Sequence, residues 1–361
     1  MRSVVAFFYA FLMLCGFCRL DAVGKYGLYE PCDCCATRST CCETYCYECS
    51  TDSDVCCLLD YVNPCHWTYG LRGEFLYWRA HQKDLDYAVD DLGANPVDGE
   101  THFLRSEYRP GFRVAVSATP PCADWQIRYE YTNLHTKEQG SVRAPDGGTL
   151  NLPLSHPAGL ADAELADGSN RLLYDVGDVL AYGQCCLGDS VTLRPFGGFR
   201  FLRMDQRLHV EYSGAAIADG PQDIKFNSDF KALGLRGGSE VEFTLCGGLK
   251  TYAGVGGSAL VARNKSHQQE YHRGTGAVVV DLRESERTTL FGWDVKVGIL
   301  YEYLLCNSFS VETGIGYEFH QWLDTPEMRR FTNTTNTVTS TSSNGGNIGF
   351  HGGVARLQIG F

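Results

Sequence analysis

Apolar and polar residues alternate strictly over long stretches near the end of this chain. Between Phe291 and Tyr303 every odd-numbered residue is apolar, while Asp294, Lys296 and Glu302 lie among the even-numbered ones. The run from Phe309 to His320 repeats the pattern with one threonine on its apolar side. Successive side chains of a β-strand point to opposite faces, so a period of two places one set on each face. The pattern predicts strands with one apolar face and one polar face.

The same alternation recurs earlier in the chain. It is clear in Phe112–Ala118 and Trp125–Thr132, and weaker in the ranges 70–80, 170–183, 190–204, 226–236, 241–254 and 258–272. So many alternating segments predict an all-β fold. The assignment of faces is unsafe where a bulge could reverse it, which applies to the glycine-rich strands with Gly247, Gly248, Gly254, Gly256 and Gly257. It is ambiguous at 68–80, where both faces are apolar.

A soluble β-sandwich would also alternate, so other features must decide between the two folds. Several segments reach 10 to 13 residues, enough to cross a bilayer when tilted, and aromatic residues lie near their ends. Beyond the first residues no stretch approaches 18 apolar residues, and in lipid only helices and closed barrels satisfy the backbone. The sequence therefore predicts a transmembrane antiparallel up-and-down β-barrel. Roughly 20 to 25 residues per strand and loop gives about 12 strands, with 10 to 14 allowed, in an even number.

The two ends of the chain support export to the outer membrane. Residues 1–22 carry Arg2 and then a short apolar run, which is typical of a signal peptide. The last residues alternate and end in Phe361, which resembles the C-terminal assembly signal of bacterial outer-membrane barrels. We therefore expect a signal peptide over 1–22, a cysteine-rich periplasmic segment over 23–66 and the barrel over 67–361. Two long segments, Gln139–Asn170 and Asp324–Gly346, are expected to be outer loops.

The cysteine-rich segment holds most of the 17 cysteines. Its candidate disulfide residues are Cys32, Cys34, Cys35, Cys41, Cys42, Cys46, Cys49, Cys56, Cys57 and Cys65. An exported protein passes through an oxidising compartment, which favours disulfides. The alternative is a metal site at the C-x-x-C of Cys46 and Cys49, but a second pair at similar spacing would be needed for zinc. We expect no metal, and the connectivity is open.

Charged residues on the polar faces are the candidate pore lining. The set comprises Arg113, Arg128, Glu130, Arg194, Arg200, Asp294, Lys296, Glu302, Glu312 and Glu318. Rings of such charges and the pore radius set selectivity in channels. Their mixed signs predict at most a modest ion preference. We expect His320 to be a water-exposed histidine rather than a titrating group of the lumen.

The sequence shows no sign of an enzyme. The motifs G-x-S-x-G, H-E-x-x-H and G-x-x-x-x-G-K-[ST] are absent. We expect no catalytic residues and no cofactor. The formal net charge of −12 argues against nucleic-acid binding, because no basic excess is available to neutralise phosphates.

Several short motifs stand in order along the chain, and together they resemble a known family. They are Gly73–Trp78, Arg109–Val114, the pair Asp124 and Trp125, and Leu193–Arg200. In this order they resemble the major-outer-membrane-protein-like pore-forming family of Legionella and environmental chlamydiae, over roughly 68–361. The resemblance implies an outer-membrane porin that is a general diffusion channel for small hydrophilic solutes. The alternative is a structural or adhesive outer-membrane barrel without significant conductance.

The implied partners are outer-membrane lipid, the barrel assembly machinery and a homo-oligomer. The cysteine-rich segment is similar to the disulfide-cross-linked envelope of chlamydiae, which suggests disulfide-linked envelope proteins as further partners. Our hypothesis is that Cys32 to Cys65 tie the barrel into a periplasmic network. Non-reducing gels of whole envelopes should then show reductant-sensitive multimers, and a monomer alone would contradict the hypothesis.

Overall fold

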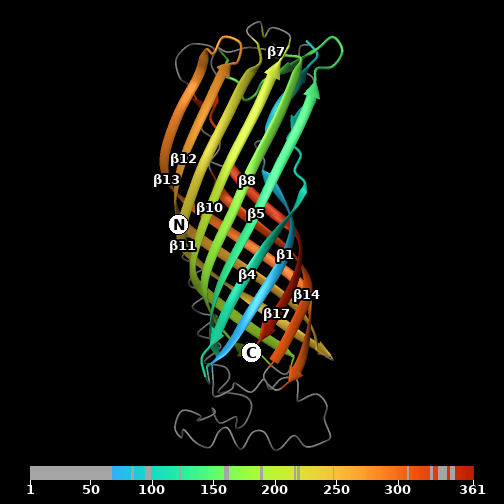
Figure 1. The fold of residues 1–361 in the computed structure, drawn as a ribbon, viewed down its shortest axis with the longest axis vertical. Helices are drawn as coiled ribbons and strands as arrows, with labels where there is room; N and C mark the ends of the chain where they lie inside the picture. Colours follow the sequence, from blue (N-terminus) through green and yellow to red (C-terminus); the bar gives the residue numbers. More distant parts are fainter. Residues whose placement is uncertain are drawn as a thin grey trace, which may run out of the picture.

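The computed structural model shows a tall, closed β-barrel (Figure 1). It describes residues 67–82, 85–93, 99–121, 123–157, 162–187, 190–214, 217, 220–246, 248–306, 309–325, 328–331, 340–341 and 346–361. The signal peptide and the cysteine-rich segment predicted from the sequence lie outside these residues. Among the described residues, no helix is long and apolar enough to cross a membrane.

Ten antiparallel strands form the barrel. They are β1 (Thr68–Gln82), β4 (Tyr108–Thr119), β5 (Trp125–Arg143), β8 (Leu165–Gly183), β10 (Val191–Ser213), β11 (Gln222–Cys246), β12 (Leu249–His272), β13 (Val278–Cys306), β14 (Phe309–Thr325) and β17 (Gly346–Gly360). Each strand pairs with the next barrel strand along the chain, and the pairing of β17 with β1 closes the cylinder. The two-residue strand β9 (Cys185–Cys186) pairs with the start of β10.

The remaining strands belong to the long connections at one end of the barrel. A small four-stranded sheet consists of β2 (Asp86–Asp91), β3 (Thr101–Phe103), β6 (Thr149–Asn151) and β7 (Asp162–Ala163). The pair β15 (Arg330–Phe331) and β16 (Ser340–Thr341) lies in the connection from β14 to β17. The C-terminus lies at the lower end of the barrel in Figure 1, and these connections lie at the opposite, upper end. Outer-membrane barrels carry their long loops outside, so this end is extracellular.

The alternation seen in the sequence separates the outer surface from the interior. On β13, Trp293, Val297 and Tyr301 face outward and are 43 to 50% exposed, whereas Asp294 and Leu300 face inward and are buried. At ~3.4 Å per residue and a tilt of ~45°, the apolar run of this strand rises about 30 Å, which matches the hydrocarbon core of a bilayer. We name the outward apolar surface of the barrel the lipid belt.

The barrel continues beyond the lipid belt on one side. Strands β10 to β13 are 23 to 29 residues long, whereas β1 and β4 have 15 and 12 residues. Towards the extracellular end, the outward face of these long strands changes from apolar Phe201, Leu233 and Val261 to charged Arg203 and Lys231. The long strands therefore rise above the membrane as a polar extension, visible at the top of Figure 1.

Inward-facing glycines make room for large aromatic side chains. A Cβ added to Gly292 would lie 2.5 Å from the ring of Trp322, and one added to Gly316 would collide with the hydroxyl of Tyr252. Gly292 lies directly opposite Trp322 on the neighbouring strand. A bulkier residue at either glycine would overpack the interior, so these glycines let a narrow barrel accept aromatic rings.

The antiparallel barrel predicted from the sequence is confirmed, and its ten strands lie at the lower limit of the expected range. The estimate was too high because strands β10 to β13 alone have 23 to 29 residues, so each of them with its loop exceeds the 20 to 25 residues assumed. The ranges 226–236, 241–254 and 258–272 form only two strands, because the chain turns between Cys246 and Leu249. The register from Gln222 to Thr244 is continuous, so no bulge occurs at Gly254–Gly257, and the shift lies at Thr244/Cys246. The loop expected over Gln139–Asn170 is shorter, because β5 continues to Arg143 and β8 starts at Leu165.

A pair of substitutions on β13 tests where the membrane ends. Val297→Arg places a charge in the middle of the lipid belt and should cost about 2–4 kcal/mol in the free energy of unfolding from lipid vesicles. Ser285→Glu adds a charged side chain to the outward face of the same strand above the belt, opposite Lys265, and should cost less than about 0.5 kcal/mol. Urea titration followed by heat-modifiable gel mobility measures both. Equal costs would show that the belt is misplaced.

Candidate functional site

The barrel interior is the candidate site, because inward side chains of all ten strands meet there. Its first layer contains buried ion pairs centred on Arg113 of β4. The Arg113 guanidinium donates to Glu74 at 2.6 Å, to Glu318 at 2.8 and 3.0 Å, and to the Thr132 hydroxyl at 3.0 Å. Arg356 of the last strand donates to the other oxygen of Glu74 at 2.8 Å. The first and last strands are thus joined inside the barrel as well as along their edges.

A second cluster continues this layer across the lumen. Arg200 binds Asp178 in a two-pronged ion pair, with distances of 2.7 and 2.6 Å. Arg236 binds Asp294 in the same way at 2.5 and 3.0 Å, and its Nε lies 3.6 Å from Asp178. All four side chains are at most 7% exposed. The planar fork of arginine matches a carboxylate, which makes such pairs geometrically specific.

A third cluster lies on the periplasmic side of these pairs. Glu240 accepts hydrogen bonds from Lys296 at 2.7 Å and from the Tyr182 hydroxyl at 3.1 Å. The Arg128 guanidinium lies 4.2 Å from the centre of the Tyr182 ring. The three clusters are named here the ion-pair layer. Within it each buried carboxylate described above has a cationic partner, which lowers the cost of taking the charges out of water.

The periplasmic mouth of the barrel is more open. Arg194 pairs with Glu242 at 2.6 Å, and Lys250 pairs with Glu302. Arg194, Lys250 and Glu302 are partly exposed. This charged vestibule therefore reaches water before the ion-pair layer begins.

An aromatic layer covers the ion-pair layer on its extracellular side. Trp78, Tyr174, Trp322 and Phe350 are at most 2% exposed and belong to one buried cluster. The rings of Tyr174 and Phe350 lie 4.4 Å apart, and the Trp322 indole donates to the Tyr174 hydroxyl at 3.2 Å. A void of about 20 Å³ remains between this aromatic layer and the ion-pair layer, with room for about one water molecule.

A third barrier lies at the extracellular end. The small sheet packs its side chains into a second apolar cluster with Tyr87, Leu150, Tyr212 and Ile224. The Tyr212 hydroxyl donates to the backbone oxygen of Tyr87 at 2.6 Å. We name this arrangement the cap. Its strands come from two different connections, β1–β4 and β5–β8, so the cap fastens both connections over the barrel.

A buried carboxyl fastens the cap to the polar extension. Glu270 lies near the end of β12, above the lipid belt. Its carboxylate accepts hydrogen bonds from the Ser155 hydroxyl at 2.8 Å, the His156 backbone N–H at 2.9 Å and the side-chain amide of Gln222. Burial raises the pKa of Glu270 to about 7, against the opposing effect of these three donors. The carboxyl therefore takes up a proton at a higher pH than an ordinary glutamate does.

All ten residues predicted to line a pore point into the barrel. They are Arg113, Arg128, Glu130, Arg194, Arg200, Asp294, Lys296, Glu302, Glu312 and Glu318. Eight of them take part in the ion pairs or ring contacts described above; Glu130 adds a contact with Arg72, and Glu312 lies 3.8 Å from Arg356. That they line a conducting pore stays a prediction.

His320 differs from expectation. Its side chain is buried rather than in water, because the ring lies 4.6 Å from that of Trp78 and Nε2 lies 3.1 Å from Glu318.

Sequence reasoning missed half of the ion-pair layer. The missed residues are Glu74, Asp178, Arg236, Glu240 and Arg356. Glu74 lies in the strand that is apolar on both faces, and the strand of Arg236 and Glu240 pairs with the glycine-rich stretch where faces were unsafe. Arg356 alternates with the apolar residues before Phe361, and this signal could have identified it.

Phe361 lies beside the first strand at the periplasmic end. Its backbone exchanges two hydrogen bonds with Tyr69, at 2.7 and 2.9 Å, and its ring centre lies 6.3 Å from that of Tyr69. A role as an assembly signal stays a prediction. All ten candidate disulfide cysteines lie outside the described residues.

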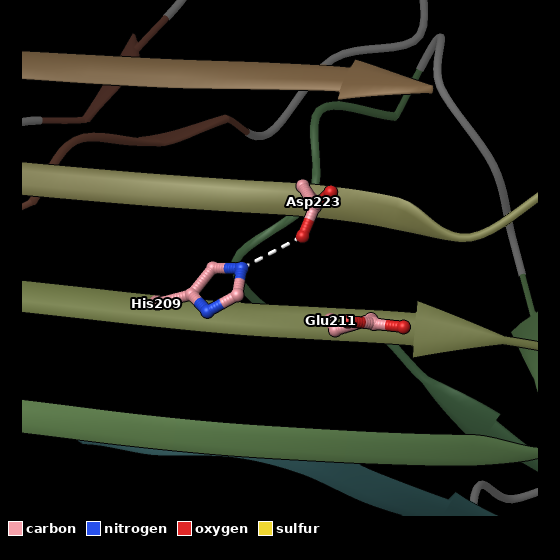
Figure 2. A group of neighbouring side chains, drawn as sticks. All are labelled: His209, Glu211 and Asp223. Atoms are coloured by element: carbon pink, nitrogen blue, oxygen red, sulfur yellow. Dashed lines mark hydrogen bonds and ion pairs between the residues drawn. The ribbon is translucent and has the colours of Figure 1, made fainter. Parts of the chain in front are cut away.

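A second group of polar side chains lies on the outward face of the extension (Figure 2). His209 and Glu211 of β10 and Asp223 of β11 offer ligand atoms within 4.8 Å of one another. The His209 ring lies 2.7 Å from Asp223, and Arg273 binds both carboxylates at 2.7 to 3.3 Å. Because the Arg273 guanidinium already binds both carboxylates, this group is an ion-pair cluster, and a metal ion would have to displace Arg273. Sequence reasoning missed it because its members come from two strands and a turn.

Comparison with known proteins identifies one family. A family profile described as the Legionella pneumophila major outer membrane protein precursor matches residues 62–357. No curated protein matches the chain.

Solved outer-membrane barrels resemble the chain at low identity. The outer membrane protease OmpT from Escherichia coli is 8% identical, with a TM-score of 0.43, and the match covers 81% of this chain and 96% of OmpT. The toluene transporter TodX from P. putida is 9% identical with a TM-score of 0.36, over 83% of this chain and 91% of TodX. Neisserial surface protein A is 10% identical with a TM-score of 0.22, over 81% and 96%.

Removing Arg113 tests whether the ion-pair layer is dry. Arg113→Met would leave Glu74 and Glu318 short of a buried partner, and the free energy of unfolding from vesicles should fall by about 3–5 kcal/mol. Adding Glu318→Gln to this variant should recover part of the loss. Urea unfolding followed by tryptophan fluorescence measures both.

Arg109→Met is the matched control on the same strand. Arg109 pairs at 2.8 Å with Glu107, whose side chain is 68% exposed, so its loss should cost at most about 1 kcal/mol. Equal costs for the two variants would mean that water screens the charges of the lumen.

Proposed function

The chain belongs to the family described as the Legionella pneumophila major outer membrane protein precursor and resides in the bacterial outer membrane, and we propose that it is a structural barrel whose interior is closed to solutes. The single observation that carries this proposal is the filled lumen. Between the vestibule and the extracellular end, a solute would meet the ion-pair layer, the aromatic layer and the cap in turn.

Strand number supports the proposal. Barrels of about eight strands have an interior that side chains can just fill, whereas porins of 16 to 18 strands leave an aqueous channel. With ten strands this barrel is near the small end. Its inward residues include Trp78, Trp322 and Tyr174, whose volumes suffice to span such a lumen when glycines such as Gly292 face them.

The general diffusion channel predicted from the sequence is the second candidate. The partly exposed vestibule favours it, because Arg194, Lys250 and Glu302, with the buried Glu242, provide charges of both signs near the periplasmic entrance. The barriers above the vestibule are held by non-covalent contacts alone among the described residues. A channel would require the ion-pair layer and the aromatic layer to separate together.

The finer partner assignments from the sequence also belong to the proposal. We propose that the barrel assembly machinery inserts the chain through its last strand, and that the cysteine-rich segment joins the barrel to other envelope proteins by disulfides. Support for the first is the exposed Phe361 at the periplasmic end of β17. Support for the second remains the density of cysteines before residue 66.

Planar bilayer recordings distinguish the two candidates. The full chain, refolded into vesicles and fused with the bilayer, should give no discrete conductance steps, because the ion-pair layer, the aromatic layer and the cap fill the lumen one above another. Heat-modifiable gel mobility of protein taken from the same vesicles shows that the barrel is folded and inserted. An absence of conductance then cannot result from failed insertion. Reproducible steps from inserted wild-type protein would refute the closed barrel and establish the channel.

A further inference from the structure

Four cations form a continuous row on the outward face of the extension. Arg203, Lys231, Arg263 and Arg287 lie directly opposite one another in register on β10, β11, β12 and β13. All four residues are exposed. Neighbouring strands lie about 4.8 Å apart, so four positive charges fall within roughly 15 Å. Like charges directly opposite on a sheet are destabilising, so the row needs a compensating negative charge.

The protein itself supplies only part of that compensation. Arg203 pairs with Asp205 at 2.6 Å, and Lys231 pairs with Asp229 at 3.0 Å. Among the residues that the structure describes, Arg263 and Arg287 have no carboxylate within 4.0 Å. Half of the row is therefore without an anionic partner.

The surface on the extracellular side of the row is hollowed and carries more positive charge. A concavity of about 990 Å³ lies there, and Arg207, Lys265 and Arg283 contribute to its lining. Asp205, Asp229 and Glu284 also line it. Lys265, like Arg263 and Arg287, forms no ion pair with the described residues. The row and the concavity together make a cationic ledge, which we define by Arg203, Lys231, Arg263, Lys265 and Arg287.

The surface on the membrane side of the ledge is apolar. Phe201, Leu233 and Val261 lie in register with one another, one outward position below the ledge, and are 49 to 68% exposed. They form the upper edge of the lipid belt. An amphiphile with an anionic head and hydrocarbon chains would meet both surfaces at once, whereas a free anion would contact the ledge alone.

We propose that the cationic ledge binds the phosphorylated headgroup of a glycolipid in the outer leaflet, with its acyl chains against Phe201, Leu233 and Val261. Arginine forks match phosphate oxygens, and each cation near an anionic lipid surface adds to the affinity. The bound phosphates supply the negative charge that Arg263 and Arg287 lack. Lipid at this place would also brace the tall side of the barrel, where β10 to β13 leave the membrane.

Binding of defined lipids to the purified full chain in detergent tests the proposal. The probe is diphosphorylated lipid A, compared with the same lipid after removal of both phosphates. The wild type should bind the diphosphorylated form at least tenfold more tightly, and this preference should shrink at high salt. Arg263→Gln with Arg287→Gln should weaken binding of the diphosphorylated form by at least tenfold.

Arg79→Gln with Arg143→Gln is the matched control. It removes two outward, exposed arginines from strands that do not carry the ledge, and binding should change less than twofold. A second measurement compares the free energy of unfolding of the ledge variant and the wild type, with and without lipid A. Without lipid A the ledge variant should be at least as stable as the wild type, because repulsion within the row is relieved, whereas with lipid A the wild type should be the more stable.

Three outcomes would overturn the proposal. The first is equal binding of phosphorylated and dephosphorylated lipid by the wild type. The second is equal weakening by the ledge and control variants. The third is binding of inorganic pyrophosphate or a soluble acidic polysaccharide as tightly as lipid A, which would assign the ledge to a free anion or to a soluble polymer.

Discussion

Neutralising charge inside a narrow cylinder is the constraint on which the rest of this structure depends. Arg113, Asp178 and Arg236 are taken out of water at the level of the membrane, where an unpaired charge costs several kcal/mol. Their partners lie on neighbouring strands or on strands two to three positions away around the barrel, so the ion pairs line the inner wall and reach into the lumen. A lumen narrowed in this way cannot also hold a wide column of water. The same contacts that stabilise the barrel therefore close it, and stability and permeability become opposing properties of one layer.

The outer surface obeys the complementary constraint, because it must match the membrane at each height. Aromatic and aliphatic residues cover β13 up to Phe291, and charged residues such as Arg287 begin within a few positions. On the side of β1 and β4 the strands end soon after this boundary, whereas β10 to β13 continue beyond it. The barrel is therefore asymmetric about its axis, and its tall side presents a charged wall just above the lipid. The cap fills the opening that the tall strands surround.

The regular period of the strands explains how much the sequence could predict. On β13 and β14 no bulge interrupts the membrane-spanning residues, so the alternation of side chains between the two faces is enough to place Asp294, Lys296 and Glu318 inside the barrel. Alternation could not reveal that Arg113 binds Glu318. The two residues are separated by 205 positions, and their contact depends on the number of strands and on the register of each strand pair. The strand number was overestimated because β10 to β13 have 23 to 29 residues each, more than an average length per strand and loop allows for. Whether the lumen is filled depends on ring volumes across the barrel, which no single strand encodes.

The ion pair between Glu74 and Arg356 has a consequence for how the chain reaches its final state. The two residues are separated by 282 positions, on the first and last barrel strands, and can meet only when the cylinder shuts. Glu318 of β14 and Arg113 of β4 likewise come within reach of each other only when β1 pairs with β17. Drying of the interior is therefore the final event of assembly. An open sheet would separate Arg356 from Glu74 and Glu318 from Arg113, so the pairing of β1 with β17 completes the ion-pair layer.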